Sequence, residues 1–290
     1  MSLFSPKSWF DRSPIVPVLR LGGVIGNSSP FSPALNLAGL AEQIERAFSV
    51  KNAKAVALQI NSPGGSPVQS KLIFNRIRAL AQEKEIPVYS FVEDVAASGG
   101  YWLCLAGDEV YADDSSILGS IGVISAGFGF NKAIEKIGVE RRVYTAGERK
   151  MSLDPFQPEQ PDEIVRLKAL QQEIHAAFRS LVENRRGDKI AKAGDMLFTG
   201  EFWSGTKALD LGLIDGLGDL RSVMREKFGD KVNLKLIKQK RGLFSRTGIG
   251  SQLLGHQQGH QFTVQNLTTG LSADLINTLE ERALWSRFGL

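Results

Sequence analysis

The sequence predicts an α/β fold in which a parallel β-sheet is covered by helices. Between residues 14 and 105, short apolar runs typical of buried strands alternate with longer segments whose apolar residues recur at helical spacing. Two glycine-rich loops directly follow predicted strands, and in parallel sheets such loops meet at the carboxyl edge, where ligands bind. The chain has 290 residues, 42% of them hydrophobic, which is enough to bury a sizeable core.

The predicted elements follow in chain order. The first strand lies within residues 14–25, where an apolar run ends at Gly22-Gly23. The first helix spans 35–50, because its apolar side chains fall on one broad face. By the same two patterns we predict strands at 53–60, 87–92, 109–112, 121–125, 140–145 and 232–237, and helices at 68–83, 98–105 and 161–185.

Three parts are expected along the chain. Residues 1–13 form a loose lead-in, and the globular domain spans 14–237. Residues 238–290 combine a linker rich in Gly, Gln, Ser and basic residues with an amphipathic helix at 272–288. The apolar face of that helix, with Leu275, Ile276, Leu279 and Trp285, has three candidate partners: its own domain, another subunit or a membrane.

Composition limits the partners and the location. The single cysteine, Cys104, rules out an intramolecular disulfide. The net charge of +4 is mild, and the basic run over 235–246 is interpreted as a solvated linker or a contact with anionic lipids. No nucleic-acid partner is expected. No signal peptide or transmembrane segment is evident, so we expect a cytoplasmic protein or one held peripherally on the inner membrane.

Ser98 is the candidate nucleophile. It stands between a predicted strand and a predicted helix, where backbone N–H groups lack helical acceptors and the helix dipole favours negative charge. Gly99 lets a substrate carbonyl approach the backbone closely. The alternative is a plain helix cap, the commoner role of serine at such a place. The loop 61–66 either supplies a second amide donor at Gly65 or forms a simple turn.

A nucleophilic serine needs a base, and the three histidines are poorly placed for that role. His175 belongs to the predicted long helix, where we expect a surface or core-edge position. His256 and His260 lie in the linker, and nothing nearby completes a metal site. A lysine serves as base when its amine is neutral, which burial favours. Lys150 follows a predicted strand beside apolar Met151, although a surface position is the ordinary alternative.

Several segments together resemble a known family. They are Asn61–Gly65, Asp94–Tyr101, Gly119–Val123, Thr145–Lys150, Phe198–Gly200 and Leu211–Asp215. In this order they resemble the signal peptide peptidase A family, serine peptidases of the crotonase-like superfamily that also includes the Clp protease subunit. The resemblance implies a crotonase-like ββα superhelical fold. It also implies hydrolysis of signal-peptide remnants or other unstructured or membrane-derived peptides, without metal or organic cofactor.

The resemblance further implies roles for five residues. Ser98 matches the nucleophile, Lys150 the general base, and Ser120 the hydroxyl that orients the lysine. The backbone amides of Gly65 and Gly99 match the oxyanion hole. Because family members form ring-like oligomers whose sites can use neighbouring subunits, we expect a homo-oligomer that acts on peptides or proteins.

Two other functions stay open at this point. A crotonase-type acyl-CoA enzyme would keep the paired glycine amides but would need carboxylates at its acyl site. An inactive scaffold that binds peptides or membrane partners would need no Ser98, Ser120 and Lys150 together. The chain also departs from the family pattern at Met151, where some members place Asp.

Overall fold

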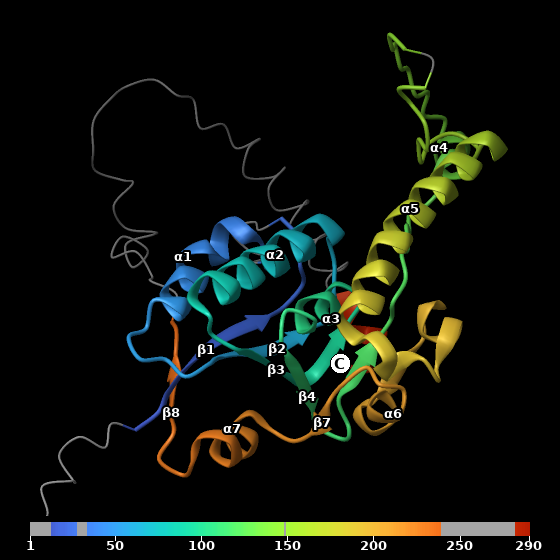
Figure 1. Ribbon diagram of the computed structural model, residues 1–290. Helices are drawn as coiled ribbons and strands as arrows, with labels where there is room; N and C mark the ends of the chain where they lie inside the picture. The colour runs from blue at the N-terminus through green and yellow to red at the C-terminus, as the bar shows by residue number, and fades with distance from the viewer. Residues whose placement is uncertain (1–12, 28–33, 148, 239–281) are drawn as a thin grey trace, which may run out of the picture.

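A largely parallel sheet forms the centre of the molecule (Figure 1). This computed structural model describes residues 13–27, 34–147, 149–238 and 282–290. The strands are β1 (Ile15–Gly22), β2 (Val56–Ser62), β3 (Val88–Ala97), β4 (Glu109–Ala112), β5 (Ile117–Gly119), β6 (Phe202–Ser204), β7 (Gly216–Leu217) and β8 (Asn233–Leu236). They run in the order β6-β5-β3-β2-β1-β8, and β4 joins β3 to β7. Only the pairing of β5 with β6 is antiparallel, so the predicted α/β class is confirmed.

Helices lie on both sides of this sheet. They are α1 (Leu37–Phe48), α2 (Pro67–Lys84), α3 (Gly99–Cys104), α4 (Asn131–Lys136), α5 (Pro161–Arg186), α6 (Gly205–Asp210) and α7 (Leu220–Phe228), with 3₁₀ turns at Gly187–Ile190 and Gly194–Phe198. In Figure 1, α1 and α2 cover one face and α7 lies on the other. Helix α1 begins where the Asn36 side chain accepts a hydrogen bond from the Gly39 N–H (2.8 Å), and it buries Leu40 and Ile44 against the sheet.

Strand β3 is bent, and the bend directs its end toward the candidate site. Its first half pairs with β4 from Tyr89 to Val92, and its second half pairs with β5 from Val95 to Ala97. Asn61 holds the bend, because its side chain donates to Asp94 (2.7 Å) and accepts from the Val95 N–H (3.1 Å). The register against β2 shifts at the same level, as at a β-bulge.

The segment Leu211–Asp215, part of the family resemblance, is anchored by buried polar contacts. Tyr101 in α3 donates its hydroxyl to the Leu213 carbonyl oxygen at 2.7 Å, and burial raises the pKa of that hydroxyl, so it stays protonated. Arg186 at the end of α5 is buried and forms an ion pair with Asp215 (2.8 Å). These contacts hold the segment Leu211–Asp215 against both α3, which follows the turn at Ser98, and the end of α5.

Residues 122–160, which we call the arm, project away from the sheet together with the first turns of α5 (Figure 1). Helix α4 within the arm has no buried residue. Large apolar side chains of the arm face solvent, among them Phe128 (80% exposed) and Tyr144 (92% exposed). Large exposed apolar surfaces often mark an interaction site.

Two predicted strands are wrong, and both lie at the arm. No strand forms at 121–125. The strand in this region is β5, and it ends at Gly119 because Gly119 and Ser120 adopt positive φ angles of 111° and 51°. Residues 140–145 form no strand, since no neighbouring strand offers hydrogen-bond partners to that exposed segment. The other elements predicted within 14–237 are found within about five residues of their expected bounds, and most of the helix predicted at 272–288 lies outside the described residues.

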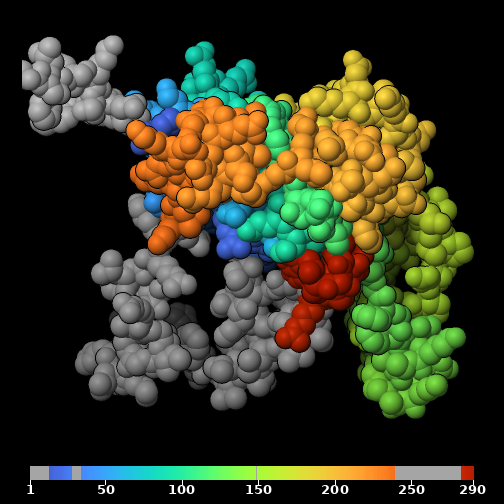
Figure 2. Space-filling model, turned by 90° about the horizontal axis from the view of Figure 1, so that it is seen from below, coloured from blue at the N-terminus to red at the C-terminus, as the bar shows by residue number. Residues whose placement is uncertain are grey.

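The described end of the chain docks on its own domain. Residues 282–286 are helical, and Trp285 and Phe288 pack against the apolar cluster of Val95 and Ala97. Figure 2 shows this segment, in red, seated against the body of the molecule. Of the three partners considered for the terminal helix, these residues contact the chain's own sheet. Several predicted features lie outside the described residues. They are residues 1–12 of the lead-in, most of the linker with its basic run and both histidines, and Leu275, Ile276 and Leu279.

Candidate active site

Ser98 occupies a sharp turn between β3 and α3. Its backbone angles are φ 52° and ψ −121°, a conformation that costs a non-glycine residue on the order of 1–3 kcal/mol. The Ser98 side chain makes no capping hydrogen bond to α3, so it is not the plain helix cap that was the alternative. A strained serine at a strand-to-helix turn, with its hydroxyl free, is the arrangement of a nucleophile elbow.

Two glycine amides lie beside this turn. Gly64 and Gly65 have φ angles of 105° and 138°, which bring the loop after β2 against the start of α3. A Cβ built on Gly99 would lie only 3.4 Å from the Gly65 nitrogen. Among the described residues, neither the Gly65 N–H nor the Gly99 N–H has a hydrogen-bond acceptor. Two adjacent free donors near a hydroxyl suit an oxyanion hole better than a simple turn.

Ser120 lies next to Ser98 because their strands are paired. Ala97 of β3 is in register with Gly119 of β5, and the Ser98 N–H donates to the Gly119 carbonyl oxygen at 2.8 Å. The Ser120 N–H donates to the Glu201 carbonyl oxygen at 2.6 Å, which holds this second turn in place. The structure therefore brings together four of the five predicted site residues: Ser98, Ser120, Gly65 and Gly99.

Ser98 and Ser120 open into one cavity of about 520 Å³. Its lining combines a polar stripe of α5 at helical spacing with apolar side chains from other segments. The remaining lining residues are Gly122, Val123, Ile124, Lys168, Gln171, Gln172, His175, Phe198, Thr199, Gly200 and Arg287. A substrate side chain would fit a concave site of this size.

His175 is a site residue that sequence reasoning missed. Its Nε2 lies 3.2 Å from the Ile121 carbonyl oxygen, which can only accept, so this nitrogen carries the proton. The contact ties α5 to the residue after Ser120. A signal was present in the sequence, because Lys168, Gln171 and His175 share one face of the predicted helix.

Lys150 is the predicted site residue that the structure does not bring to Ser98. It is exposed in a turn of the arm, and it does not line the Ser98 cavity. Three residues further on, the Leu153 N–H binds the Glu163 carboxylate near the start of α5. Glu163 precedes His175 by twelve residues, about 18 Å along the helix. The pairing of Lys150 with Ser98 stays a prediction.

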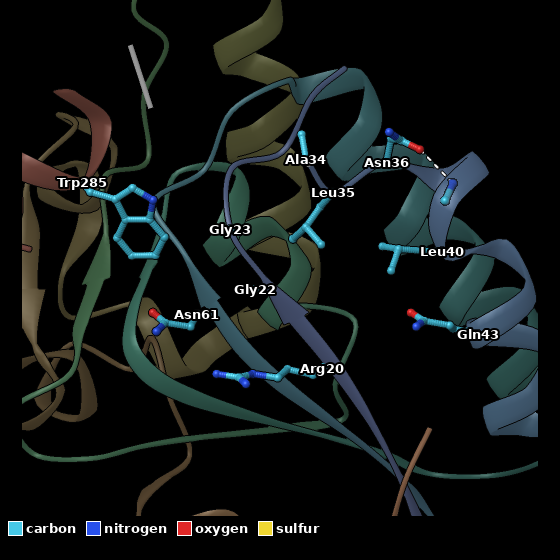
Figure 3. A pocket seen from close by; sticks show the side chains of 11 residues that line it. Arg20, Gly22, Gly23, Ala34, Leu35, Asn36, Leu40, Gln43, Asn61 and Trp285 are labelled. Atoms are coloured by element: carbon cyan, nitrogen blue, oxygen red, sulfur yellow. Dashed lines mark hydrogen bonds between the residues drawn. The ribbon is translucent and has the colours of Figure 1, made fainter. Parts of the chain in front are cut away.

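A second cavity, of about 550 Å³, contains none of the predicted site residues. Arg20, Asn61 and Trp285 line it together with the start of α1, as Figure 3 shows. Trp285 belongs to the docked end of the chain and lies across the opening from Leu40 and the rest of α1. With no candidate nucleophile or base among its lining residues, this cavity is a poorer candidate for the catalytic centre.

The described residues offer little to a metal ion. Within 13–27, 34–147, 149–238 and 282–290, no three His, Cys, Asp or Glu side chains come together. Cys104 is fully buried in α3, and this burial raises the pKa of its thiol, so it is a poor ligand and a poor nucleophile. The expectation of a cofactor-free site stays a prediction.

Residues 80–234, more than half of the chain, match the sequence model of peptidase family S49. This chain belongs to peptidase family S49. A protein of Enterococcus faecium named as a signal peptide peptidase, SppA, is 30% identical over 254 residues, which cover 82% of this chain and 70% of that protein. The predicted resemblance to the signal peptide peptidase A family is confirmed, and the match places the chain in a family of serine peptidases.

Other relatives of this S49 chain are longer. The chloroplastic serine protease SPPA of Arabidopsis thaliana is 31% identical over 255 residues, 83% of this chain and 37% of that protein. A Brucella abortus protein named Na⁺/H⁺ antiporter NhaA is 54% identical over 276 residues, 95% of this chain and 37% of that protein. The chain spans about 37% of the length of both proteins.

The antiporter name belongs to the whole Brucella protein, whereas the region shared with it here is S49 peptidase. Among the helices of the described residues, none has the length and apolar character that crossing a bilayer requires. Family membership agrees with the predicted crotonase-like fold. It favours a peptidase over the acyl-CoA enzyme that stayed open above.

Proposed function

We propose that this chain is a Ser–Lys endopeptidase with Ser98 as nucleophile and Lys150 as general base. The neutral Lys150 amine takes the proton of the Ser98 hydroxyl as its oxygen attacks a peptide carbonyl carbon. The amine of the substrate leaves with that proton, and an acyl-enzyme ester remains on Ser98. Water then attacks the ester and passes a proton to the same lysine. The bond between the acyl carbon and the Ser98 oxygen breaks, that oxygen takes the proton back from the lysine, and the acid is released.

The observation that carries this proposal is the turn at Ser98 with its paired amides. The Gly65 and Gly99 N–H groups have no acceptor among the described residues and are free to bind the oxygen that becomes negative during attack. Donors fixed in advance around that oxygen give the largest single contribution to catalysis in many acyl-transfer enzymes. Ser120, in the same cavity, would hydrogen-bond the lysine and orient it.

Lys150 reaches this site, in our proposal, from the arm of a second copy. The arm, which includes Lys150, projects away from the sheet and exposes apolar side chains such as Phe128 and Tyr144. Lys150 is not among the residues that line the Ser98 cavity. A neighbouring subunit would bury those apolar side chains, and its lysine would complete the Ser98 cavity. The active site is therefore incomplete in one chain and complete in an assembly.

The cavity itself favours a neutral amine. Lys168 and Arg287 line it, and no Asp or Glu is among its lining residues. A lysine that enters such a cavity meets like charges and loses contact with water, and both effects favour its uncharged form. We take its substrates to be unstructured peptides, signal-peptide remnants among them, in keeping with the name of the Enterococcus relative.

Covalent labelling tests the nucleophile. A fluorophosphonate probe should label the assembled wild-type protein and fail to label Ser98→Ala. Lys150→Ala should keep its fold and lose turnover, and wild-type turnover should rise with pH as the lysine loses its proton. No labelling of well-folded, assembled protein, or full turnover by Lys150→Ala, contradicts the proposal.

Mixing two inactive variants tests the origin of the lysine. In assemblies formed from Ser98→Ala and Lys150→Ala chains, a site built between copies can receive Ser98 from one chain and Lys150 from the other. Random mixing should then restore activity to about a quarter of the sites, given identical interfaces around a closed ring. A site built within one chain gives no recovery, because each chain lacks one partner.

A further inference from the structure

The Ser98 cavity carries positive charge without any compensating carboxylate. Lys168 and Arg287 contribute a charge each. None of the thirteen lining residues is Asp or Glu. By contrast, the cavity of about 600 Å³ beside β3 and α7 is lined by four carboxylates, those of Glu93, Asp94, Asp113 and Asp219.

The two permanent cations are free to bind a ligand. On the same helix, Arg166 and Arg179 each form an ion pair with a carboxylate four residues away. Within the described part of the chain, neither Lys168 nor Arg287 has a carboxylate partner. A cation left unpaired beside a nucleophile is available to a negative group of the substrate.

Neutral donors complete the cavity wall. The amide groups of Gln171 and Gln172 belong to the same stripe of α5 as Lys168, and each can donate hydrogen bonds to an oxygen. Ser98 lines the same cavity, so a group bound there would belong to the peptide residues around the bond that is cut. The arrangement suits a planar anion with two oxygens.

We propose that this cavity binds a carboxylate of the peptide close to the scissile bond, with Lys168 and Arg287 as its charged ligands. The proposal rests on the proposed peptidase function and gives it a substrate preference. The carboxylate has two sources, an Asp or Glu side chain near the cleaved bond or the free C-terminus of a short peptide. Peptides of both kinds are therefore compared with their uncharged counterparts.

Binding to the full-length Ser98→Ala protein tests the preference without requiring turnover. Fluorescence anisotropy is measured with two sets of labelled peptides. In the first set, Glu is exchanged for Gln at each position that flanks the scissile bond. In the second set, a free C-terminal acid is exchanged for a C-terminal amide. We expect one carboxylate form to bind about ten- to a hundredfold more tightly than its amide, as charge-assisted hydrogen bonds typically give. Because Lys168 and Arg287 are exposed, this ratio should shrink at high salt.

Variants assign the preference to the cavity. Lys168→Gln in the Ser98→Ala background should bring the acid-to-amide ratio close to one, and Lys168→Arg should keep it. Arg166→Gln is the matched control on the same helix, because Arg166 does not line the cavity and its loss should leave the ratio unchanged. Lys168→Glu should reverse the preference toward a Lys-containing peptide.

The outcomes separate this proposal from the one on which it rests. Equal affinities for the acid and amide forms in every peptide comparison overturn the carboxylate subsite. A complete absence of binding by both forms also overturns it. A preference that persists in a Lys168→Gln, Arg287→Gln double variant overturns it as well. Ser98-dependent hydrolysis of uncharged peptides by the wild type would still support the peptidase, because that reaction needs no carboxylate.

Discussion

Ser98 and Ser120 stand side by side one residue beyond the paired ends of β3 and β5, and both have positive φ angles, 52° and 51°. Each turn is fixed by a backbone hydrogen bond, from Ser98 to Gly119 at 2.8 Å and from Ser120 to Glu201 at 2.6 Å. The parallel register places two hydroxyl groups in one cavity, and the strained backbone turns them out of the sheet.

Relief of strain at Ser98 should be measurable as stability. Ser98→Gly and Ser98→Ala both remove the hydroxyl and should both abolish turnover. Glycine adopts a positive φ freely, whereas alanine keeps the strained Cβ, so Ser98→Gly should unfold with a free energy about 1 kcal/mol higher than Ser98→Ala. Urea unfolding of the two variants checks this. Equal stabilities would mean that the turn is not held in its strained conformation.

Gly65→Ala should destabilise the fold and disable the site. A Cβ at this position would lie 2.0 Å from the Ile25 carbonyl oxygen, so the loop would have to move, at a cost of about 3 kcal/mol. Gly23→Ala is the matched control: its φ is also positive (105°), but nothing lies within 4 Å of the added Cβ. We expect a cost of about 1 kcal/mol there and normal turnover. Thermal unfolding and peptide hydrolysis are compared for both, and similar losses would refute the clash.

Asp215 should make the free energy of unfolding fall at acidic pH. Burial works to raise the pKa of Asp215, but hydrogen bonds from Arg186 and Lys189 outweigh it and hold this pKa below its ordinary value. The ionised form therefore stabilises the fold at every pH above the unfolded pKa of about 3.9, and this contribution is lost as the pH falls further, through the folded value.

Asp215→Asn tests this contribution. At neutral pH the variant leaves Arg186 buried without its counter-charge and should lose about 3 kcal/mol of unfolding free energy. The gap to wild type should narrow as the pH falls below the unfolded pKa of about 3.9 and through the lower folded pKa. Asp210→Asn, at an exposed carboxylate of α6, serves as control and should show no such gap. A difference independent of pH would contradict the role of the ion pair.

Asp154 should stabilise the structure of the arm but not that of the sheet. Its side chain, 2% exposed, accepts from Arg141 (2.9 Å) and from the Phe156 N–H (3.1 Å). Asp154→Ala should raise hydrogen exchange across the arm and lower turnover about tenfold or more through misplacement of Lys150. The melting temperature of the sheet should stay unchanged.

A control for the arm is its exposed ion pair between Glu140 and Arg142, whose side chains are 70% and 69% exposed. Glu140→Ala should change neither exchange nor turnover, because such pairs contribute little. Normal turnover in Asp154→Ala, despite a loosened arm, would argue against a catalytic residue in the arm.

The sequence predicted the body of the fold well because its pattern is local. Buried strands such as the one at 53–60, and the small-residue loop around Ser98, are recognisable from a few consecutive residues. The failed strand at 140–145 has a strand-like composition, but it has no partner within the chain. Whether a segment pairs depends on what surrounds it, which its own residues do not encode.

The candidate site divides in the same way. The positions of Ser98, Gly65 and Gly99 could be predicted from the sequence, because each lies in a glycine-containing loop directly after a predicted strand. The shared helix face of Lys168, Gln171 and His175 is visible in the sequence, but the contact of His175 with the Ile121 carbonyl oxygen joins residues 54 positions apart and is seen only in the fold. The placement of Lys150 depends on an arm that leaves the body, so its partner is a question of assembly rather than of local sequence.

The positive φ at position 98 also limits which nucleophiles this scaffold can evolve. A branched Cβ is severely disfavoured there, so threonine cannot easily replace serine even though its hydroxyl has similar chemistry. Cysteine, unbranched at Cβ, meets no such barrier. Laboratory evolution from this chain should therefore reach a thiol enzyme more readily than a threonine enzyme.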